Sequence, residues 1–402
     1  MKIKLAVLFG GNSTEHEISV ISAVQAIYAM NTEKYEIIPI YITKKNEMYT
    51  GEDVGKIESY KNIPELLKKS DRVVLINDGN RVNIVKYPIK AFGKSVINNI
   101  DVAFPIVHGT NVEDGCLQGY LQTLNLPYVG CDVLASAVGM DKYVMKTVLK
   151  DNDIPVLDCV RVLSKDYNDD KEPIIEKIEK KFGYPVIVKP INLGSSIGIS
   201  KAKNREELEE SFETAFAYAT KVLVETAIEE LTEINCSVLG DETEAYASEC
   251  EHPLSSGEIL DFKEKYMPGG AKGGSKSGGS KGMASTTRII PADITSQQRD
   301  TIRTMAVKAF QVLGCNGVSR IDFMIDRKTG NIYLNEINTI PGSLSFYLWE
   351  PLGTPYMQLL DKMIDFAMKR QREKENITFS FDTNILSGVT LGRGTKGGKL
   401  NG

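Results

Sequence analysis

The stretch 318–338 restricts the fold of this chain more than any other part of the sequence. Alternating β-branched and apolar residues run through 318–326 and again through 331–337, and the turn-forming residues 327–330 separate the two runs. Period-two alternation on both sides of such a turn predicts an antiparallel hairpin, with Gly330 at the turn position that takes a positive φ. We therefore expect two neighbouring strands with a defined register.

Polar side chains recur on this hairpin at positions two residues apart. Residues i and i+2 share one face of a strand, so Glu336 and Asn338 point the same way, and a register that pairs even with even positions adds Arg320 and Asp322. Oxygen-only ligands beside a guanidinium suit Mg²⁺ bound together with phosphates, and they do not suit Zn²⁺ or copper. A surface hairpin with solvated acids is the alternative interpretation.

Length and composition indicate an ordinary globular protein of two or three domains. The chain has 402 residues, and its net charge of -5 argues against a nucleic-acid partner. The apolar run 5–9 is too short for a signal peptide or a membrane span, so we expect a cytoplasmic protein with no membrane partner. Six cysteines without a CxxC pair favour reduced thiols over a disulfide framework or a zinc site.

The first 130 residues have the pattern of an α/β domain. The chain opens with a buried-type strand at 3–9, a tight turn at 10–13 and a helix at 15–30, the β-turn-α order that begins a Rossmann-like, doubly wound domain. Further strands are expected at 36–43, 72–76 and 101–107. We assign residues 1–130 to this N-terminal domain.

Two α+β subdomains are expected after it, at 131–224 and 225–372. The first has predicted helices at 133–151 and 203–219, strands at 185–189 and 196–201, and a glycine-containing loop at 192–198. From residue 222 onward the pattern changes to predicted strands at 222–226, 234–240 and 244–251, a helix at 294–314, the hairpin, and a helix at 355–373. Both alternate strands and helices in the manner of mixed sheets covered by helices.

Two segments have low-complexity composition. The Gly/Ser/Lys stretch 269–285 lacks an apolar face and is expected to be a mobile loop, as a lid or a spacer, of which the lid is favoured because long loops in compact domains often serve a site. The tail 373–402 ends in a similar composition and is expected to be partly disordered, with an edge strand at 377–381 as an option.

Several residues are suited to binding phosphate. Lys142 at a helix start and Lys189 at a strand end can reach phosphate oxygens, and residues 194–198 (Gly-Ser-Ser-Ile-Gly) offer backbone N–H groups and hydroxyls nearby. Without the glycine-containing loop, either lysine would more often be a solvent-exposed charge. A P-loop has the pattern GxxxxGK[ST], and the Gly93-Lys94-Ser95 sequence does not complete it because Pro88 occupies the position of the first glycine. The Gly10-Gly11 turn also does not give the GxGxxG motif for a nicotinamide cofactor.

Other candidates lie at strand ends. Glu225 ends an apolar strand and Glu233 follows it, a spacing that suits an adenine and a ribose or merely a polar turn. His108 and Glu113 follow a buried strand of the first domain, at the carboxyl end where α/β sheets place ligands, although a single histidine there also suits a structural role.

Together these motifs resemble the D-alanine–D-alanine ligase family of the ATP-grasp superfamily. The motifs that carry the resemblance are Gly10 to Glu17, His108-Gly109, Glu113-Asp114-Gly115, Met140-Asp141-Lys142, Lys189-Pro190 with Gly194-Ser195-Ser196, Lys265-Tyr266, Arg320-Ile321-Asp322, and Asn335 to Thr339 with Pro341-Gly342. They follow the family's order over about residues 3–372. The resemblance implies an N-terminal Rossmann-like (pre-ATP-grasp) substrate-binding domain and two α+β ATP-grasp subdomains.

The resemblance also implies a reaction. In this family ATP phosphorylates the carboxylate of a first D-alanine, and the amine of a second amino acid attacks the acyl phosphate, which yields the dipeptide for peptidoglycan precursors. The implied cofactors are ATP and two Mg²⁺ ions, with Mn²⁺ as a substitute, and a homodimer is one expectation because the family is often dimeric.

Each family role maps onto a residue of this chain. Glu15 is implied to pair with the first substrate's ammonium group, held by Ser195 and Tyr266 and supported by His108 and Glu113. The remaining implied roles are ATP phosphates for Lys142, Lys189, Ser196 and Lys265, adenine for Glu225, ribose for Glu233, Mg²⁺ for Asp322, Glu336 and Asn338, and the oxyanion hole for Arg320 and the backbone N–H of Gly342. The segment 225–233 is one residue longer than the usual family pattern.

The chain departs from the family where the acceptor binds. After Pro-Gly the family commonly has Thr-Ser-x-Ser, whereas this chain continues through 343–349 with Tyr347 in the place of the last serine. Ser345 and Tyr347 are therefore the acceptor-binding candidates, and D-serine is an alternative acceptor. Tyr266 matches the dipeptide-forming branch, which favours an amine acceptor. Two rival hypotheses stay open: another ATP-grasp carboxylate–amine ligase, and a non-catalytic nucleotide-binding protein.

Overall fold

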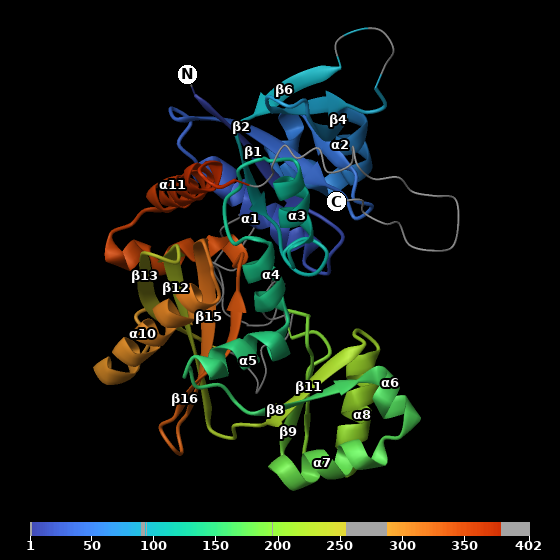
Figure 1. Cartoon of the computed structure of the whole chain (residues 1–402), viewed down its shortest axis with the longest axis vertical. Helices are drawn as coiled ribbons and strands as arrows, with labels where there is room; N and C mark the ends of the chain where they lie inside the picture. Colours follow the sequence, from blue (N-terminus) through green and yellow to red (C-terminus); the bar gives the residue numbers. More distant parts are fainter. Residues whose placement is uncertain (1, 90–92, 94, 195, 255–287, 379–402) are drawn as a thin grey trace, which may run out of the picture.

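The computed structural model describes residues 2–89, 93, 95–194, 196–254 and 288–378, and it arranges them around three β-sheets (Figure 1). The predicted loop 269–285 and the tail from 379 onward lie outside the described residues, as do Ser195, Lys265 and Tyr266. Within the described ranges, no helix combines the length and hydrophobicity that crossing a bilayer requires.

The first sheet has seven strands in the order β6-β5-β4-β3-β2-β1-β7. Its strands are β1 (Ile3–Gly10), β2 (Tyr35–Ile42), β3 (Met48–Thr50), β4 (Asp71–Asn77), β5 (Val82–Lys86), β6 (Val96–Ile100) and β7 (Val102–Ile106). Its helices are α1 (His16–Ala29), α2 (Ile63–Lys69) and α3 (Cys116–Thr123), with short 3₁₀ helices at Glu52–Gly55 and Ile57–Asn62. The β1-turn-α1 opening is confirmed.

Only part of this sheet is parallel. β1 pairs in parallel with β2 and β7, whereas β2 through β6 are joined by successive antiparallel pairings. The expected α/β alternation therefore holds for β1, β2 and β7, and strands β3, β5 and β6, which are short, were not predicted. Among the described residues, β4, β5 and β6 follow one another without an intervening helix, as antiparallel strands can, so no βαβ pattern marks β5 and β6 in the sequence.

The second sheet has four strands in the order β10-β9-β11-β8. It consists of β8 (Cys159–Leu163), β9 (Val186–Pro190), β10 (Ser200–Ala202) and β11 (Lys221–Thr226), with α6 (Ser164–Asp169), α7 (Glu172–Phe182) and α8 (Arg205–Phe216). The strand predicted at 196–201 is shorter than expected. Ser196 and Gly198 take φ values of 60° and 72°, so these residues form a turn instead of extended backbone.

The third sheet has five strands in the order β14-β13-β12-β15-β16. It consists of β12 (Leu231–Gly240), β13 (Ala245–Pro253), β14 (Arg288–Ile289), β15 (Gly317–Asp326) and β16 (Ile332–Asn338), covered by α10 (Ser296–Val312). A 3₁₀ segment η4 (Gly342–Leu348), a second one, η5 (Glu350–Leu352), and α11 (Tyr356–Glu375) follow. α11 returns to the first domain, where Leu359 and Ile364 join its core (Figure 1).

The helix predicted at 133–151 is in fact two helices. α4 (Val133–Met140) ends and α5 (Lys142–Asp151) begins on either side of Asp141, which has extended backbone and whose carboxylate accepts from the N–H groups of Tyr143 and Val144. An N-cap aspartate of this kind starts a new helix and satisfies its first donors. The break orients α5 so that Lys142, its first residue, faces the candidate site. Both helices share the core of the third sheet, whereas the predicted boundary at 131 groups them with the second, and that boundary stays a prediction.

Candidate active site

A cavity of about 440 Å³ is lined by residues of all three sheets and their connections. Thirteen of the predicted site residues line it: Glu15, His108, Glu113, Lys142, Lys189, Ser196, Glu225, Glu233, Arg320, Asp322, Glu336, Asn338 and Gly342. Residues that lie more than 300 positions apart in the sequence, such as Glu15 and Gly342, thus share one space. Two predicted residues, Ser345 and Tyr347, do not line it.

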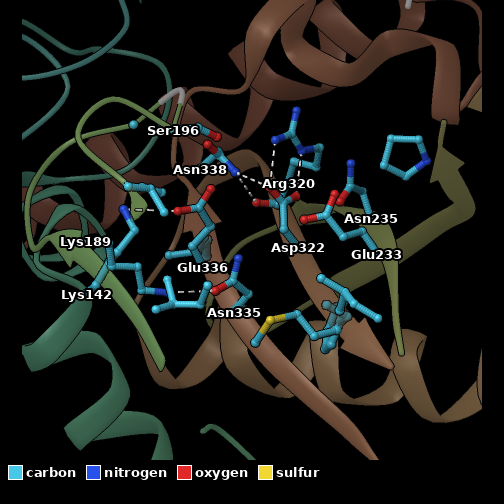
Figure 2. A pocket seen from close by; sticks show the side chains of 18 of the residues that line it. Lys142, Lys189, Ser196, Glu233, Asn235, Arg320, Asp322, Asn335, Glu336 and Asn338 are labelled. Atoms are coloured by element: carbon cyan, nitrogen blue, oxygen red, sulfur yellow. Dashed lines mark hydrogen bonds and ion pairs between the residues drawn. The ribbon is translucent and has the colours of Figure 1, made fainter. Parts of the chain in front are cut away.

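The predicted hairpin and its register are confirmed. β15 and β16 pair antiparallel, with Arg320 opposite Asn338 and Asp322 opposite Glu336, and Gly330 takes a positive φ of 77° at the turn. The four polar side chains therefore lie on one face, as the even-with-even register requires. Figure 2 shows them around the same space.

A β-bulge adds a residue that the alternation did not predict. The register shifts between Asp322 and Phe323, so that Leu334 faces Phe323 and Asn335 is left unpaired in the ladder. A bulge re-aims side chains locally. Asn335 lines the cavity, and its Oδ1 accepts a hydrogen bond from Lys189 Nζ at 3.1 Å (Figure 2).

Polar residues continue in register beyond the hairpin, across four strands. Glu336 of β16 faces Asp322 of β15, Asp322 faces Asn235 of β12, and Asn235 faces Glu251 of β13. We call these four residues the cross-strand row. All four line the cavity, so the sheet presents three carboxylates and one amide along one line. Neither Asn235 nor Glu251 was predicted, because the strands that carry them are far from the hairpin in sequence.

Cations neutralise the carboxylates of the hairpin. Arg320 donates from Nε and Nη2 to the two oxygens of Asp322, both at 2.7 Å, and Lys142 Nζ lies 3.0 Å from Glu336 Oε2. Burial of Arg320 opposes its charge, but the Asp322 carboxylate outweighs burial and holds the pKa of the guanidinium well above its usual range. Asn338 Nδ2 donates to Asp322 Oδ2 at 3.1 Å, which ties the face together.

The donor set of this face fits a hard divalent cation. It comprises the carboxylates of Asp322 and Glu336 and the amide of Asn338, all oxygen ligands. Across the described ranges, no three His, Cys, Asp or Glu side chains are grouped closely enough to hold a metal ion among themselves. Two carboxylates and an amide are too few for a closed protein site, and they match the way Mg²⁺ is shared between a protein and substrate phosphates.

A buried charge cluster is formed by residues of α5, β9 and β11. Glu225 is 2 % exposed, and its two oxygens accept from Lys146 Nζ and Lys189 Nζ, each at 2.5 Å. Burial alone would raise the pKa of Glu225, but Lys189 and Lys146 lower it to about 2. Burial lowers the pKa of Lys189, partly offset by Glu225. Lys146 was not predicted as a site residue. Its spacing of four residues from Lys142 places both lysines on one face of α5, which could have indicated it.

Close backbone approaches surround Glu15. A Cβ added to Gly194 would lie 3.1 Å from Glu15 Oε2, and one added to Gly109, at φ +84°, would lie 2.4 Å from Ser13 Oγ. Side chains at these two positions would crowd the carboxylate of Glu15 or its support. The glycines of the predicted motifs thus keep the space around this carboxylate open.

His108 and Glu113 are buried against the backbone of the segment that follows β16. Glu113 accepts from the N–H groups of Gly109 and Ile340, both at 2.9 Å, and from the hydroxyl of Thr339 at 3.2 Å. Burial raises the pKa of Glu113 to about 8. His108 contacts the carbonyl of Ile340 at 2.8 Å, and burial lowers the pKa of this histidine to about 4. The two residues join the first domain to the end of the hairpin.

Ser345 and Tyr347 lie behind the cavity wall. Ser343, Leu344 and Ser345 all take φ values near +50°, a left-handed turn that directs the chain back into the core, where Ser345 is fully buried. Tyr347 donates its hydroxyl to Glu251 Oε1 at 3.2 Å, and its ring lies 3.9 Å from the guanidinium carbon of Arg288. Direct contact of either residue with an acceptor stays a prediction.

A Rossmann-like domain followed by two α+β units, with lysines and carboxylates meeting in one cavity, defines an ATP-dependent ligase of the ATP-grasp type. Family profiles described as "D-ala D-ala ligase N-terminus" and "D-ala D-ala ligase C-terminus" match residues 4–131 and 148–365. The chain therefore belongs to the D-alanine–D-alanine ligase family.

Individual relatives agree with this assignment. The D-alanine–D-alanine ligase of Thermosipho melanesiensis is 38% identical over 385 residues, 96% of this chain and 98% of that protein. The one of Caldicellulosiruptor bescii is 40% identical over 393 residues, 94% of this chain and 99% of the relative. Among solved structures, VanG D-Ala:D-Ser ligase from Enterococcus faecalis has a TM-score of 0.75 at 32% identity, covering 91% of this chain and 100% of that one. The D-alanine-D-alanine ligase from Coxiella burnetii has a TM-score of 0.74 at 29% identity, covering 93% and 97%.

Proposed function

We propose that this protein joins two D-alanine molecules at the expense of ATP, in the cytoplasm, and supplies the dipeptide for peptidoglycan precursors. One observation carries the proposal: Glu15, the lysines Lys142 and Lys189, and the hairpin residues Arg320, Asp322, Glu336 and Asn338 all line a single cavity. The residues proposed to bind an amino acid, a polyphosphate and a hard cation thereby share one space.

In the first step the γ-phosphoryl group passes to the carboxylate of the first D-alanine. Glu15 pairs with the ammonium group of that substrate, and its carboxylate lies beside the backbone of Gly194 and Gly109. Lys142 and Lys189 hold phosphate oxygens, and Ser196 adds a hydroxyl from the turn between β9 and β10. Asp322, Glu336 and Asn338 would hold two Mg²⁺ ions, which would supply positive charge opposite the phosphates.

In the second step the amine of the acceptor attacks the acyl carbon. A C–N bond forms, the C–O bond to phosphate breaks, inorganic phosphate leaves with the electron pair, and the amine loses a proton. Arg320 and the backbone N–H of Gly342 face the oxygen on which negative charge develops. Donors fixed in advance at that position stabilise the tetrahedral intermediate more than the ground state.

The other predicted roles complete the nucleotide site. Glu225 and the backbone after it take the adenine and Glu233 takes the ribose, and the contacts of Glu225 with Lys146 and Lys189 support the proposal by fixing its carboxylate at the cavity wall. Ser195, Lys265 and Tyr266 are proposed for Glu15 support and phosphate binding on the family motifs alone. A homodimer is proposed on the same basis.

D-Serine is a second candidate acceptor. The observation that favours it is the likeness to VanG D-Ala:D-Ser ligase, at a TM-score of 0.75, together with the departure from the family motif at Tyr347. Because D-serine differs from D-alanine by a hydroxyl, the two acceptors share every charged contact and differ only in one polar group.

A substrate screen tests the proposal. The protein is incubated with ATP, Mg²⁺ and D-alanine, alone or with D-serine or D-lactate, and ADP release is measured while products are identified by mass. We expect D-alanyl-D-alanine and ADP with D-alanine alone. Absence of ADP release and of any D-alanyl product under all conditions would overturn the proposed reaction, and a dominant D-alanyl-D-serine product would transfer the proposal to the second candidate.

A further inference from the structure

The cross-strand row ends in a buried ion pair for which the two steps above have no use. Glu251, at the end of the row, is 2 % exposed for its side chain and accepts from Arg288 Nη1 at 2.7 Å, from Asn235 Nδ2 at 3.0 Å and from the Tyr347 hydroxyl at 3.2 Å. The side chain of Arg288 is itself only 10 % exposed, yet it lines the cavity. The cavity wall thus carries a largely buried guanidinium that is held in place by Glu251.

The position of Arg288 along the row indicates which substrate it meets. Lys142 stands at the Glu336 end of the row, Arg320 pairs with Asp322 in the middle, and Arg288 stands at the Glu251 end. The proposed phosphate and cation sites occupy the Glu336–Asp322 half. The proposed oxyanion donor Arg320 marks the reacting carbon, and the cavity continues from it toward Arg288, which leaves that end of the cavity for the attacking acceptor.

Packing holds the guanidinium of Arg288 in one position. The guanidinium of Arg288 lies over the ring of Tyr347 at 3.9 Å and is held from the side by the carboxylate of Glu251. Burial raises the pKa of Tyr347 to about 12, so its hydroxyl stays protonated and donates to Glu251. Both oxygens of the Glu251 carboxylate accept hydrogen bonds from protein donors. The carboxylate therefore orients Arg288 and is not itself arranged to bind a substrate ammonium group.

We propose that Arg288 binds the α-carboxylate of the acceptor amino acid, and that Glu251 and Tyr347 are positioning residues that hold its guanidinium in place. The inference rests on the proposed ligase function and specifies the second half of its site. A planar guanidinium matches a carboxylate with two parallel hydrogen bonds, and it carries its charge at every working pH. Arginine thereby takes over the task that the family commonly gives to the serine that Tyr347 replaces.

The test separates the acceptor subsite from the donor subsite. Hydroxylamine can replace the acceptor amine, attack the acyl phosphate and release D-alanine hydroxamate with inorganic phosphate, so hydroxamate formation reports ATP and the first D-alanine alone. In Arg288→Gln we expect the KM for acceptor D-alanine to rise by at least about 30-fold, the loss typical when one partner of a buried charged contact is removed. The hydroxamate rate, and the KM values for ATP and the first D-alanine in that assay, should stay within about threefold of wild type.

Acceptor charge gives a readout that a merely structural role would not move. D-Alaninamide lacks the carboxylate, so wild-type protein should prefer D-alanine to it as acceptor, in kcat/KM, whereas Arg288→Gln should lose most of that preference. Arg288→Lys keeps a charge and should retain part of it. Tyr347→Phe keeps the ring beneath Arg288 and removes only the hydroxyl, so it should raise the acceptor KM modestly and leave the hydroxamate rate unchanged.

Arg299→Gln is the matched control. Arg299 of α10 pairs at 3.5 Å with Glu249 of β13, the strand that also carries Glu251, and Arg299 does not line the cavity. The acceptor preference of this variant should equal that of wild type. An unchanged D-alanine to D-alaninamide preference in both Arg288 variants would overturn the inference, and so would a rise confined to the ATP KM, which would assign Arg288 to phosphate. Failure of the wild type to form hydroxamate would instead overturn the ligase proposal itself.

Discussion

Lys189 on β9 donates to Glu225 on the neighbouring strand β11 at 2.5 Å, and this contact joins two residues that sequence alone assigned to different parts of a nucleotide site. Lys146 reaches the second oxygen of the same carboxylate. One acid thus stabilises two lysines at the cavity wall, and the lysines hold the acid ionised. The site has a charge framework of its own before any substrate arrives.

Removing the acid from this framework should be costly. In Glu225→Gln both lysines keep their positive charges but lose the buried counter-charge, a change that typically destabilises by about 3–5 kcal/mol. We expect a lower free energy of unfolding in urea and a raised KM for ATP, because Lys189 is no longer fixed. Lys150→Gln, which removes an exposed partner of Asp158, is the control and should leave the free energy of unfolding close to that of wild type. Equal stability of Glu225→Gln and wild type would contradict the assignment.

Glu225 also predicts how stability responds to acid. Its pKa is lowered from 4.5 to about 2 in the folded state, so its contribution is fully present above pH 4.5 and is lost as the pH falls toward 2. The free energy of unfolding should therefore fall across this window in wild type, and less steeply in Glu225→Gln. Urea titrations at pH 5, 4 and 3 measure the two slopes. Parallel slopes would show that other carboxylates dominate acid unfolding.

Glu113 predicts the opposite dependence at higher pH. Burial raises its folded-state pKa from 4.5 to about 8, so between these values the folded protein binds a proton that the unfolded chain has released. Stability from this group should fall as the pH rises through that window, with a slope of up to about 1.4 kcal/mol per pH unit.

Substitution of Glu113 isolates that slope. Glu113→Gln cannot titrate, although it gives up one of the two acceptor oxygens that receive the N–H groups of Gly109 and Ile340, at a cost of about 1 kcal/mol. Wild type should lose about 2 kcal/mol between pH 4.5 and 6, more than the lost acceptor costs, so we expect the variant to be less stable than wild type at pH 4, more stable at pH 7, and flatter in its dependence from pH 4 to 8. Urea denaturation across that range measures both, and an unchanged slope would mean that Glu113 is ionised throughout.

Sequence reasoning succeeded where one local rule decides the outcome. The period of two in β15 and β16 placed Arg320, Asp322, Glu336 and Asn338 on one face, and the register confirms it. Asn335 was missed because a bulge interrupts the period of two at this residue, and the alternation of the strand's sequence does not reveal the bulge. Sequence reasoning also predicted one helix where the cap at Asp141 makes two, since apolar periodicity continues through the cap.

Contacts between residues far apart in the sequence were the other feature that could not be predicted. Asn235 and Glu251 join the row only because β12 and β13 happen to be the next strands of the sheet, and strand order is a property of the whole fold. Tyr347 was assigned to the acceptor on its place in a motif, yet three residues with left-handed backbone, Ser343 to Ser345, bring it behind Arg288. Backbone of that kind in non-glycine residues carries little signal in sequence.

The hairpin predicts a strict requirement for a divalent cation. Asp322 and Glu336 are paired with Arg320 and Lys142, so a cation has to be shared with phosphate oxygens and should bind tightly only with ATP present. EDTA should abolish ADP release, and Mg²⁺ or Mn²⁺ should restore it. In Glu336→Gln the Mg²⁺ concentration for half-maximal rate should rise by about tenfold or more. The same Mg²⁺ dependence in variant and wild type would remove Glu336 from the ligand set.

Arg320 supplies the most demanding test of the chemistry. Arg320→Ala removes the donor aimed at the developing oxyanion, a loss that typically costs about 100- to 1000-fold in rate. It also leaves Asp322 without its two 2.7 Å contacts, so Arg320→Lys, which keeps the charge but cannot make both bonds, is needed beside it. We expect ligation in the lysine variant to lie between alanine and wild type, because charge alone restores only part of the stabilisation. Coupled phosphate release with D-alanine measures all three proteins, with circular dichroism to confirm folding. Phosphate release by a folded Arg320→Ala variant within a few-fold of wild type would show that the tetrahedral intermediate is stabilised elsewhere in the cavity.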